Sequence, residues 1–308
     1  MVRGIHHVGL AVSSAKGATR FYEGAFGFRE LSSLRWRAAD MRRLCGLPDG
    51  EDAALAVAAP NLLIALIEVQ GTTARSRPRS VTSPGITHLC VQSADMGDLQ
   101  AAATRAGASF HAQPTDLGGD ILYAYPRDPE GNVLELESLP WAATERGAWP
   151  AHVSITTPDL DRAVPFYEQL LGAAARRSPR MGPNAKIDLL TGMSGVEVSG
   201  AWISVGNLQL ELLEYHHPAA AREESPLGYR YIAFEASSLE ACRSSDAGRA
   251  QAWEEVMLTD GTAAIFGRDA DGNRIACVIP DNTMPRISDF ADAGIVARVE
   301  AALAAVLA

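Results

Sequence analysis

Residues 5–23, IHHVGLAVSSAKGATRFYE, and residues 150–168, PAHVSITTPDLDRAVPFYE, decide the fold of this chain. In each stretch a histidine, His7 or His152, enters an alternating apolar run that is typical of a β-strand. The tripeptide Phe-Tyr-Glu follows fourteen residues after each histidine, within a helical pattern that Gly27 or Gly172 is placed to end and, in the second half, Asp159 to begin. The sequence therefore predicts an internal duplication in which each half begins with a strand and then a helix.

Each half also repeats this pattern within itself. Similar strands are predicted at residues 61–68, NLLIALIE, and at residues 207–214, NLQLELLE. A further strand begins at Gly85 and another at Gly228, and each is followed by a helical stretch, an Asp-x-x-Gly-Asn turn and a last strand. The sequence thus predicts an α+β protein of four βαβββ modules, two in each half.

The predicted division of the chain follows the breaks between these modules. Modules 1 and 2 occupy residues 1–140, and modules 3 and 4 occupy residues 148–285. Residues 286–308 are rich in alanine and have helical periodicity, so we expect a C-terminal helix that packs on the body of the protein.

The composition narrows the classes of partner. The 308 residues include 27 Lys and Arg against 37 Asp and Glu, a net charge of −10, which argues against nucleic acid as a partner. The basic residues Arg75, Arg77 and Arg79 lie in a Ser/Thr/Pro-rich stretch that is typical of a solvated loop. No apolar run reaches the ~20 residues that cross a bilayer.

The four cysteines and the N-terminal sequence indicate in which cellular compartment the protein is expected. Cys45, Cys90, Cys242 and Cys277 are scattered without a CxxC motif, which indicates reduced thiols. A strand pattern starts almost at the first residue, with no signal-peptide pattern before it. We therefore expect a cytoplasmic protein without a membrane partner.

The fourfold repeat and its motifs resemble the vicinal oxygen chelate superfamily over residues 5–138 and 150–280. This family includes glyoxalase I, methylmalonyl-CoA epimerase, extradiol dioxygenases, fosfomycin-resistance enzymes and bleomycin-binding proteins. The resemblance implies two open barrels, each curled from two modules around a divalent metal ion. It implies ligands in the first and last strands of each module, whereas the reaction differs between members.

The resemblance places two ligand positions in each module of this sequence. Alanine cannot bind a metal ion and tyrosine is a poor ligand, so five of these positions are candidate metal ligands. The positions are His7 and Ala65 in module 1, His88 and Glu135 in module 2, His152 and Glu211 in module 3, and Tyr231 and Ala276 in module 4.

Two assemblies of the modules are open at this point. If neighbouring modules pair, His7, His88 and Glu135 form a two-histidine, one-carboxylate set of the kind that non-haem Fe(II) oxygenases use. If module 2 pairs with module 3, every ligand position of these two modules is filled, as in glyoxalase I-like enzymes. Neighbour pairing is the simpler topology and is preferred on that ground. His88 and Glu135 belong to the site in both assemblies.

These residues favour a metal-dependent enzyme whose small substrate offers two adjacent oxygens to one divalent ion. Fe2+ or Mn2+ is preferred, and Zn2+ or Ni2+ is compatible with the same ligands. Glu211 is a candidate base as well as a ligand, and Tyr125 is a candidate hydrogen-bond donor to the substrate. Arg35 and Arg37, beside Trp36, are candidates to bind a carboxylate.

Three functions remain after this reasoning. The first is a dioxygenase, and the second is a lyase or isomerase of the glyoxalase or epimerase type. The third, from a different class, is a metal-free small-molecule-binding protein similar to the bleomycin-resistance proteins. Four modules can close both barrels within one chain, so a homodimer is compatible with the sequence and not required by it.

Overall fold

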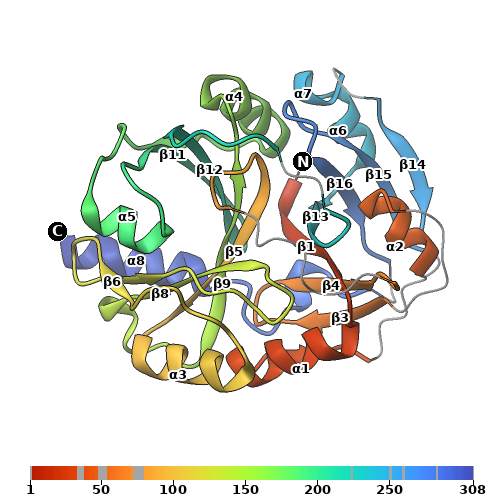
Figure 1. The fold of residues 1–308 in the computed structure, drawn as a ribbon. Coiled ribbons are helices and arrows are strands. Elements are labelled where there is room, and N and C mark those ends of the chain that lie inside the picture. Colours follow the sequence, from red (N-terminus) through yellow and green to blue (C-terminus); the bar gives the residue numbers. More distant parts are fainter. Residues whose placement is uncertain are drawn as a thin grey trace.

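A computed structural model describes residues 2–32, 38–47, 54–71, 80–222, 225–249, 252–258, 261–281 and 284–307. The two basic stretches singled out above, Arg35 to Arg37 and Arg75 to Arg79, lie outside these ranges. Within them, each quarter of the chain contains a strand, at least one helix and three further strands (Figure 1). The predicted α+β class and the four βαβββ modules are therefore confirmed.

The first sheet combines modules 1 and 4. Its eight strands follow the order β14-β15-β16-β13-β1-β4-β3-β2, and β1 and β13 lie antiparallel at its centre. Module 1 consists of β1 (Val2–Val12), α1 (Ala15–Phe26), β2 (Arg29–Glu30), α2 (Ala38–Cys45), β3 (Ala54–Ala58) and β4 (Leu63–Glu68). Module 4 consists of β13 (Gly228–Ala236), α6 (Leu239–Ser244), α7 (Asp246–Arg249), β14 (Glu254–Met257), β15 (Ala263–Arg268) and β16 (Arg274–Ile279).

The second sheet combines modules 2 and 3 in the same manner. Its order is β10-β11-β12-β9-β5-β8-β7-β6, with β5 and β9 antiparallel at the centre. Module 2 consists of β5 (Gly85–Ser93), α3 (Met96–Ala106), β6 (Thr115–Asp116), β7 (Leu122–Ala124) and β8 (Val133–Ser138). Module 3 consists of β9 (Ala148–Thr156), α4 (Leu160–Leu171), β10 (Arg176–Arg177), α5 (Ala185–Thr191), β11 (Glu197–Val205) and β12 (Leu208–His217).

The preference for neighbour pairing was wrong, because module 2 pairs with module 3 and module 1 with module 4. The linker between the halves, residues 139–147, holds one 3-10 turn, η1 (Pro140–Ala142), and leads into β9, which pairs antiparallel with β5. The connections from β4 to β5 and from β12 to β13 carry the chain between the two sheets. The β12–β13 connection, residues 218–227, is hardly longer than the linker, so the strand contacts and not the connection lengths decide the pairing.

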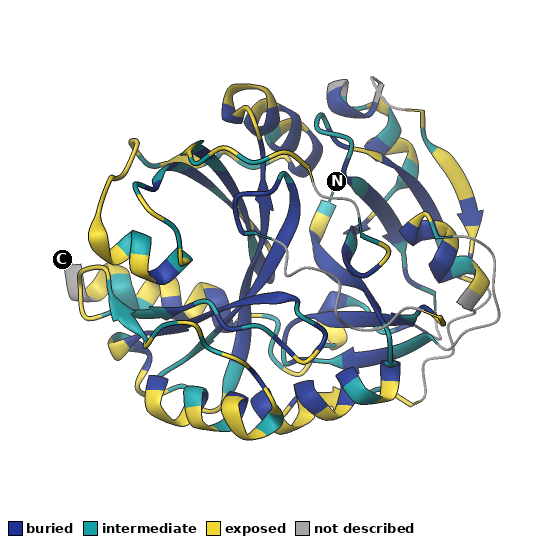
Figure 2. Ribbon diagram, in the orientation of Figure 1, coloured by how far each residue is buried: buried dark blue, intermediate teal, exposed yellow. Residues whose placement is uncertain are grey.

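The helices that follow the first strands begin and end where the sequence predicts. Asp159 caps α4 by accepting a hydrogen bond from the backbone N–H of Arg162, at 3.1 Å. Gly27 and Gly172 end α1 and α4 in the left-handed region, with φ of 71° and 70°. Figure 2 shows the outer faces of α1 and α3 exposed, while the strands behind them are buried.

The interior of the first sheet is filled by side chains. Met41, Leu44 and Cys45 of α2 pack on apolar residues of both modules, among them Leu63 and Phe266. The interior of the second sheet instead borders a cavity, described below, and the C-terminal helix α8 (Ile295–Leu307) lies beside it (Figure 1). Within residues 286–308, for which a C-terminal helix was expected, α8 occupies the part from Ile295 to Leu307.

The described residues contain no helix that is both long and apolar enough to cross a membrane. All four cysteines are buried and none forms a disulfide.

Candidate metal centre

Two side chains of module 2 point into the second barrel from neighbouring parallel strands. His88 lies on β5 opposite Val133 of β8, and Cys90 lies opposite Glu135. Side chains two residues apart on a strand share one face, so His88 and Glu135 point to the same side of the sheet.

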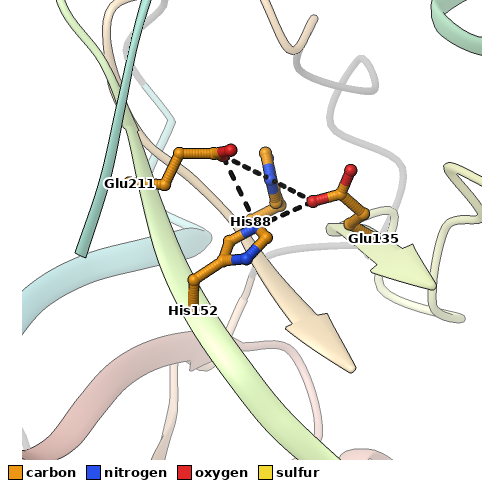
Figure 3. A group of neighbouring side chains, drawn as sticks. All are labelled: His88, Glu135, His152 and Glu211. Carbon is orange, nitrogen blue, oxygen red and sulfur yellow. Dashed lines mark hydrogen bonds and ion pairs between the residues drawn. The ribbon is translucent and has the colours of Figure 1, made fainter. Parts of the chain in front are cut away.

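Module 3 repeats this relation with its own residues. His152 on β9 lies opposite Gln209 of β12, and Ser154 lies opposite Glu211. Because β5 and β9 are antiparallel neighbours, the two pairs meet at the centre of the sheet (Figure 3).

The four side chains converge closely. Nε2 of His152 lies 2.7 Å from Oε2 of Glu135 and 3.5 Å from Oε2 of Glu211. Nε2 of His88 lies 3.3 Å and 3.4 Å from the same two oxygens. Four potential ligand atoms, one from each residue, lie within 4.8 Å of one another, and all four residues are buried.

The donor set suits a divalent cation. Nε2 of His88 and Oε2 of Glu211 are buried without a hydrogen-bond partner that satisfies geometric criteria. A buried polar atom without a partner is costly, and a bound cation would satisfy both atoms. Two imidazoles and two carboxylates are typical ligands of borderline divalent ions such as Zn2+, Ni2+, Mn2+ and Fe2+. The residues present therefore fit one metal ion.

The electrostatics of the cluster show strong coupling between acids and bases. Burial opposes ionisation of Glu135 and Glu211, but interactions with the two imidazoles outweigh it and hold the pKa of both carboxyls below the ordinary range. Burial also disfavours an imidazolium ion. The two carboxylates outweigh that effect as well, and they raise the pKa of His152 to about 10 and the pKa of His88 above its usual value. Without a metal ion, the cluster is expected to hold protons on its imidazoles.

Neighbouring residues orient the candidate ligands. The indole Nε1 of Trp202 donates to Oε1 of Glu211 at 3.0 Å, which leaves Oε2 directed at the two histidines. The hydroxyl of Thr87 lies 3.2 Å from Nδ1 of His88. Such contacts to a ligand's second atom fix its orientation in metal sites.

The predicted substrate contact, Tyr125, lies beside this cluster. Its ring centroid is 5.4 Å from that of His88, and the residue lines the cavity. Burial and the charge of Glu135 raise the pKa of Tyr125 well above its usual value, so the hydroxyl keeps its proton. A role in contacting substrate stays a prediction.

A cavity of about 460 Å³ opens from the cluster. Glu135, His152 and Glu211 form part of its wall, and the rest comes from strands and loops of modules 2 and 3, from η1, from α5 and from α8. A volume of this size lies in the range of small-molecule sites.

A comparison with known protein families assigns the chain to one of them. The model of the Glyoxalase/Bleomycin resistance protein/Dioxygenase superfamily matches residues 4–136 and again residues 149–277. The chain belongs to this superfamily. The resemblance inferred from the repeats is thereby confirmed.

Individual members of the superfamily are similar to parts of this chain. A virulence protein of Salmonella typhimurium is 29% identical over 136 residues, which cover 43% of this chain and 81% of that protein. A lactoylglutathione lyase of Arabidopsis thaliana is 30% identical over 92 residues, which cover 29% of this chain and only 30% of the lyase.

Solved structures of superfamily members match almost the whole chain. Glyoxalase I from Zea mays has a TM-score of 0.63 at 18% identity, covering 93% of both chains. A putative dioxygenase from Bacillus subtilis has a TM-score of 0.58 at 14% identity, covering 98% of this chain and 96% of that one. At these identities the two structures show a shared fold and leave the reaction open.

The superfamily's ligand positions in the other barrel do not form a comparable cluster among the described residues. His7 lies on β1, and its Nε2 is 2.9 Å from the hydroxyl of Tyr231. Ala65 and Ala276 supply no donor. Nδ1 of His7 lies 2.8 Å from Nδ1 of His6, and the cluster of side chains that fills this interior is apolar. The structure thus separates His7 from the other four candidate ligands, because module 1 pairs with module 4.

The sequence did not reveal several features of the site. The indole of Trp202 on β11 and the wall formed by α8 had no motif to mark them. Glu137, two residues beyond Glu135 on β8, also lines the cavity, and its Oε2 accepts from Nε2 of Gln92 at 2.6 Å.

Proposed function

We propose that this protein is a metal-dependent lyase or isomerase of the glyoxalase or epimerase type, which moves a proton on carbon beside a carbonyl group. The observation that carries the proposal is the convergence of His88, Glu135, His152 and Glu211, whose ligand atoms lie within 4.8 Å of one another. A four-ligand set of this kind needs no redox-active ion.

The metal would be held by these four residues. A divalent ion bound there would polarise the oxygens of a substrate that offers two of them side by side, and so favour loss of a proton from the adjacent carbon. The preference for Fe2+ or Mn2+ rested on a three-ligand set that included His7. Since His7 lies in the other barrel, we infer that Zn2+, Ni2+ or Mn2+ serves equally well.

Glu211 is the candidate base. Its Oε1 is held by Trp202, and its Oε2 lacks a hydrogen-bond partner beside the cavity. A carboxylate in this position is suited to take a proton from a substrate carbon and return it to the neighbouring one. The hydroxyl of Tyr125, which keeps its proton, is suited to donate a hydrogen bond to a substrate oxygen.

Proton exchange at carbon tests this proposal directly. The wild-type protein, loaded with Zn2+, Ni2+ or Mn2+, is incubated in D2O with 2-hydroxyacetophenone, which carries adjacent oxygens, and deuterium uptake is followed by mass spectrometry. We expect exchange that stops when the metal is removed with a chelator. Glu211→Gln should slow exchange by at least about a hundredfold, with metal content measured in the same samples to separate loss of base from loss of ion.

Two results would contradict the proposal. One is a purified protein that takes up no divalent ion at any concentration tested, which would favour the metal-free binding function. The other is stoichiometric metal with oxygen consumption and ring cleavage of a catechol, which would favour a dioxygenase.

A further inference from the structure

The walls of the cavity indicate the chemical class of the substrate. We infer that the substrate has a largely apolar body, aromatic or branched aliphatic, and carries at most one negative charge besides its adjacent oxygens. The inference rests on the proposed function and narrows it, because the reaction alone would accept substrates of any polarity.

Apolar side chains from separate elements make up most of the wall. They face the cavity from module 2, from module 3 and from the C-terminal helix, so that an occupant would meet hydrocarbon on several sides. Among these apolar lining residues are Leu117, Ile121, Trp141, Leu190, Val299 and Leu303. Burial of an apolar body against such walls favours binding in proportion to the apolar area removed from water.

The C-terminal helix supplies one side of this wall. Val296, Val299 and Leu303 lie on one face of α8 and line the cavity, and Val296 and Val299 are buried. Ala301 lies on the exposed face of the same helix. The helix therefore acts as a wall of the site, and its apolar face is a determinant of substrate choice.

Charge in the cavity argues against a substrate with several carboxylates. Besides Glu135 and Glu211, the lining includes Glu137 and Glu300, whereas Arg176 is the one arginine or lysine among the described lining residues. One divalent ion and one guanidinium do not offset the carboxylates of the wall together with two carboxylates of a substrate that has no cation of its own. A glutathione adduct, in which one ammonium group offsets one of the two carboxylates, is disfavoured by its polar peptide body and not by its net charge.

Arg176 is the residue of the cavity wall that could bind one negatively charged group of the substrate. Its guanidinium lies 4.7 Å from the ring centroid of Trp202, whose Nε1 donates to the candidate ligand Glu211. No carboxylate among the described residues forms an ion pair with Arg176. The guanidinium thus has donors available for one anionic or carbonyl group of a substrate that also reaches the metal centre.

Ligand titrations test the inference with three probes that share the α-hydroxyacyl group. Lactate carries a methyl group on it, mandelate a phenyl group, and S-lactoylglutathione a polar peptide with two carboxylates and one ammonium group. The full chain is first titrated with Mn2+, Zn2+ and Ni2+, and the probes are then titrated calorimetrically into whichever loaded form is stoichiometric. Leu303→Gln removes apolar wall without adding charge, and Ala301→Gln places the same side chain on the opposite face of α8.

We expect mandelate to bind at least about tenfold more tightly than lactate, and more tightly than S-lactoylglutathione. Leu303→Gln should reduce the preference for mandelate over lactate by about threefold or more, and Ala301→Gln should leave it unchanged. Lactate binding as tightly as mandelate, or S-lactoylglutathione binding more tightly than mandelate, would overturn the inferred substrate class while leaving the metal-dependent function in place. Failure of the wild-type chain to take up any of the three ions would overturn the proposed function, and this inference with it, before a probe is added.

Discussion

Oε2 of Glu135 lies 2.7 Å from Nε2 of His152, although the two residues belong to opposite halves of the duplicated chain. Each half alone carries only two of the four converging side chains on the second sheet. The site therefore depends on the antiparallel contact between β5 and β9, which joins module 2 to module 3. Duplication has placed a candidate metal centre across the junction between the halves.

A matched pair of histidine variants tests which barrel holds the ion. His88 and His7 occupy equivalent positions on the first strands of modules 2 and 1, and both are fully buried. His88→Gln should lower metal affinity by at least about tenfold, because loss of even an indirect contact to a ligand costs this much. His7→Gln should leave metal affinity unchanged, as measured by elemental mass spectrometry and competition with a chromogenic chelator. Loss of metal in His7→Gln with retention in His88→Gln would place the ion in the wrong barrel for the proposal.

Metal binding should release protons. The carboxylates of Glu135 and Glu211 raise the pKa of His152 to about 10 and the pKa of His88 above its usual value, whereas a metal ligand must be a neutral imidazole. The apparent metal affinity should therefore rise between pH 6 and pH 8, by about tenfold per pH unit for each proton released. Calorimetry in buffers of different ionisation enthalpy counts these protons, and a heat independent of the buffer would refute the expected coupling.

The metal-free protein should respond to pH in the opposite direction. The folded-state pKa of His152 lies above the value of about 6.5 expected in an unfolded chain. Its contribution to folding is fully present below pH 6.5 and is lost as the pH rises through about 10. Thermal unfolding of chelator-treated protein should show the melting temperature falling over this window, and His152→Gln should flatten that part of the curve.

Trp202 is expected to act as a positioning residue through Glu211. Trp202→Phe keeps an aromatic ring under Arg176 and removes the Nε1 donor that lies 3.0 Å from Oε1 of Glu211. We expect metal affinity to fall by about tenfold and the rate of proton exchange at saturating metal to fall as well. Trp141→Phe, which alters a lining indole that makes no hydrogen bond through its Nε1, is the matched control. Equal effects of the two substitutions would indicate a packing role only.

Much of the fold could be predicted because short stretches of the sequence determine its individual strands and helices. The repeated histidine-led strands, the Phe-Tyr-Glu helices and the glycine stops at Gly27 and Gly172 are short-range signals, and each formed the expected element. The same locality explains why His88 and Glu135 were recognised together, since one module supplies both.

The pairing of the modules could not be predicted in the same way. His7 and His152 stand at equivalent places in the repeat, each followed by Val and, fourteen residues on, by Phe-Tyr-Glu. What separates them is the long-range partner of each strand, β13 for β1 and β5 for β9. The one sequence feature that pointed to this pairing was the filled set of ligand positions in modules 2 and 3, and the simpler topology was preferred over it. The indole of Trp202 and the wall of α8 were missed because they reach the site only through tertiary packing.

Two carboxylates outside the site illustrate a further limit. Glu68 and Glu214 lie three residues beyond the ligand positions Ala65 and Glu211, on the opposite face of their strands. Oε2 of Glu68 accepts from the backbone N–H of Ala15, and Oε2 of Glu214 accepts from that of Leu160, so each carboxylate stabilises the N-terminus of a helix. Their position on the opposite face is consistent with strand alternation, whereas their partners depend on where the helices return.

The barrel of modules 1 and 4 should contribute to stability and not to metal binding. The hydroxyl of Tyr231 lies 2.9 Å from Nε2 of His7 in an interior filled by α2 and apolar strand residues. Tyr231→Phe removes this hydrogen bond with little change of shape, so the free energy of unfolding should fall by about 1 kcal/mol and the melting temperature by about 2 °C. Metal content and metal affinity should equal those of the wild type, measured on the same preparation. A loss of metal from Tyr231→Phe without loss of folded protein would show that this barrel takes part in metal binding, contrary to the separation of the two interiors proposed above.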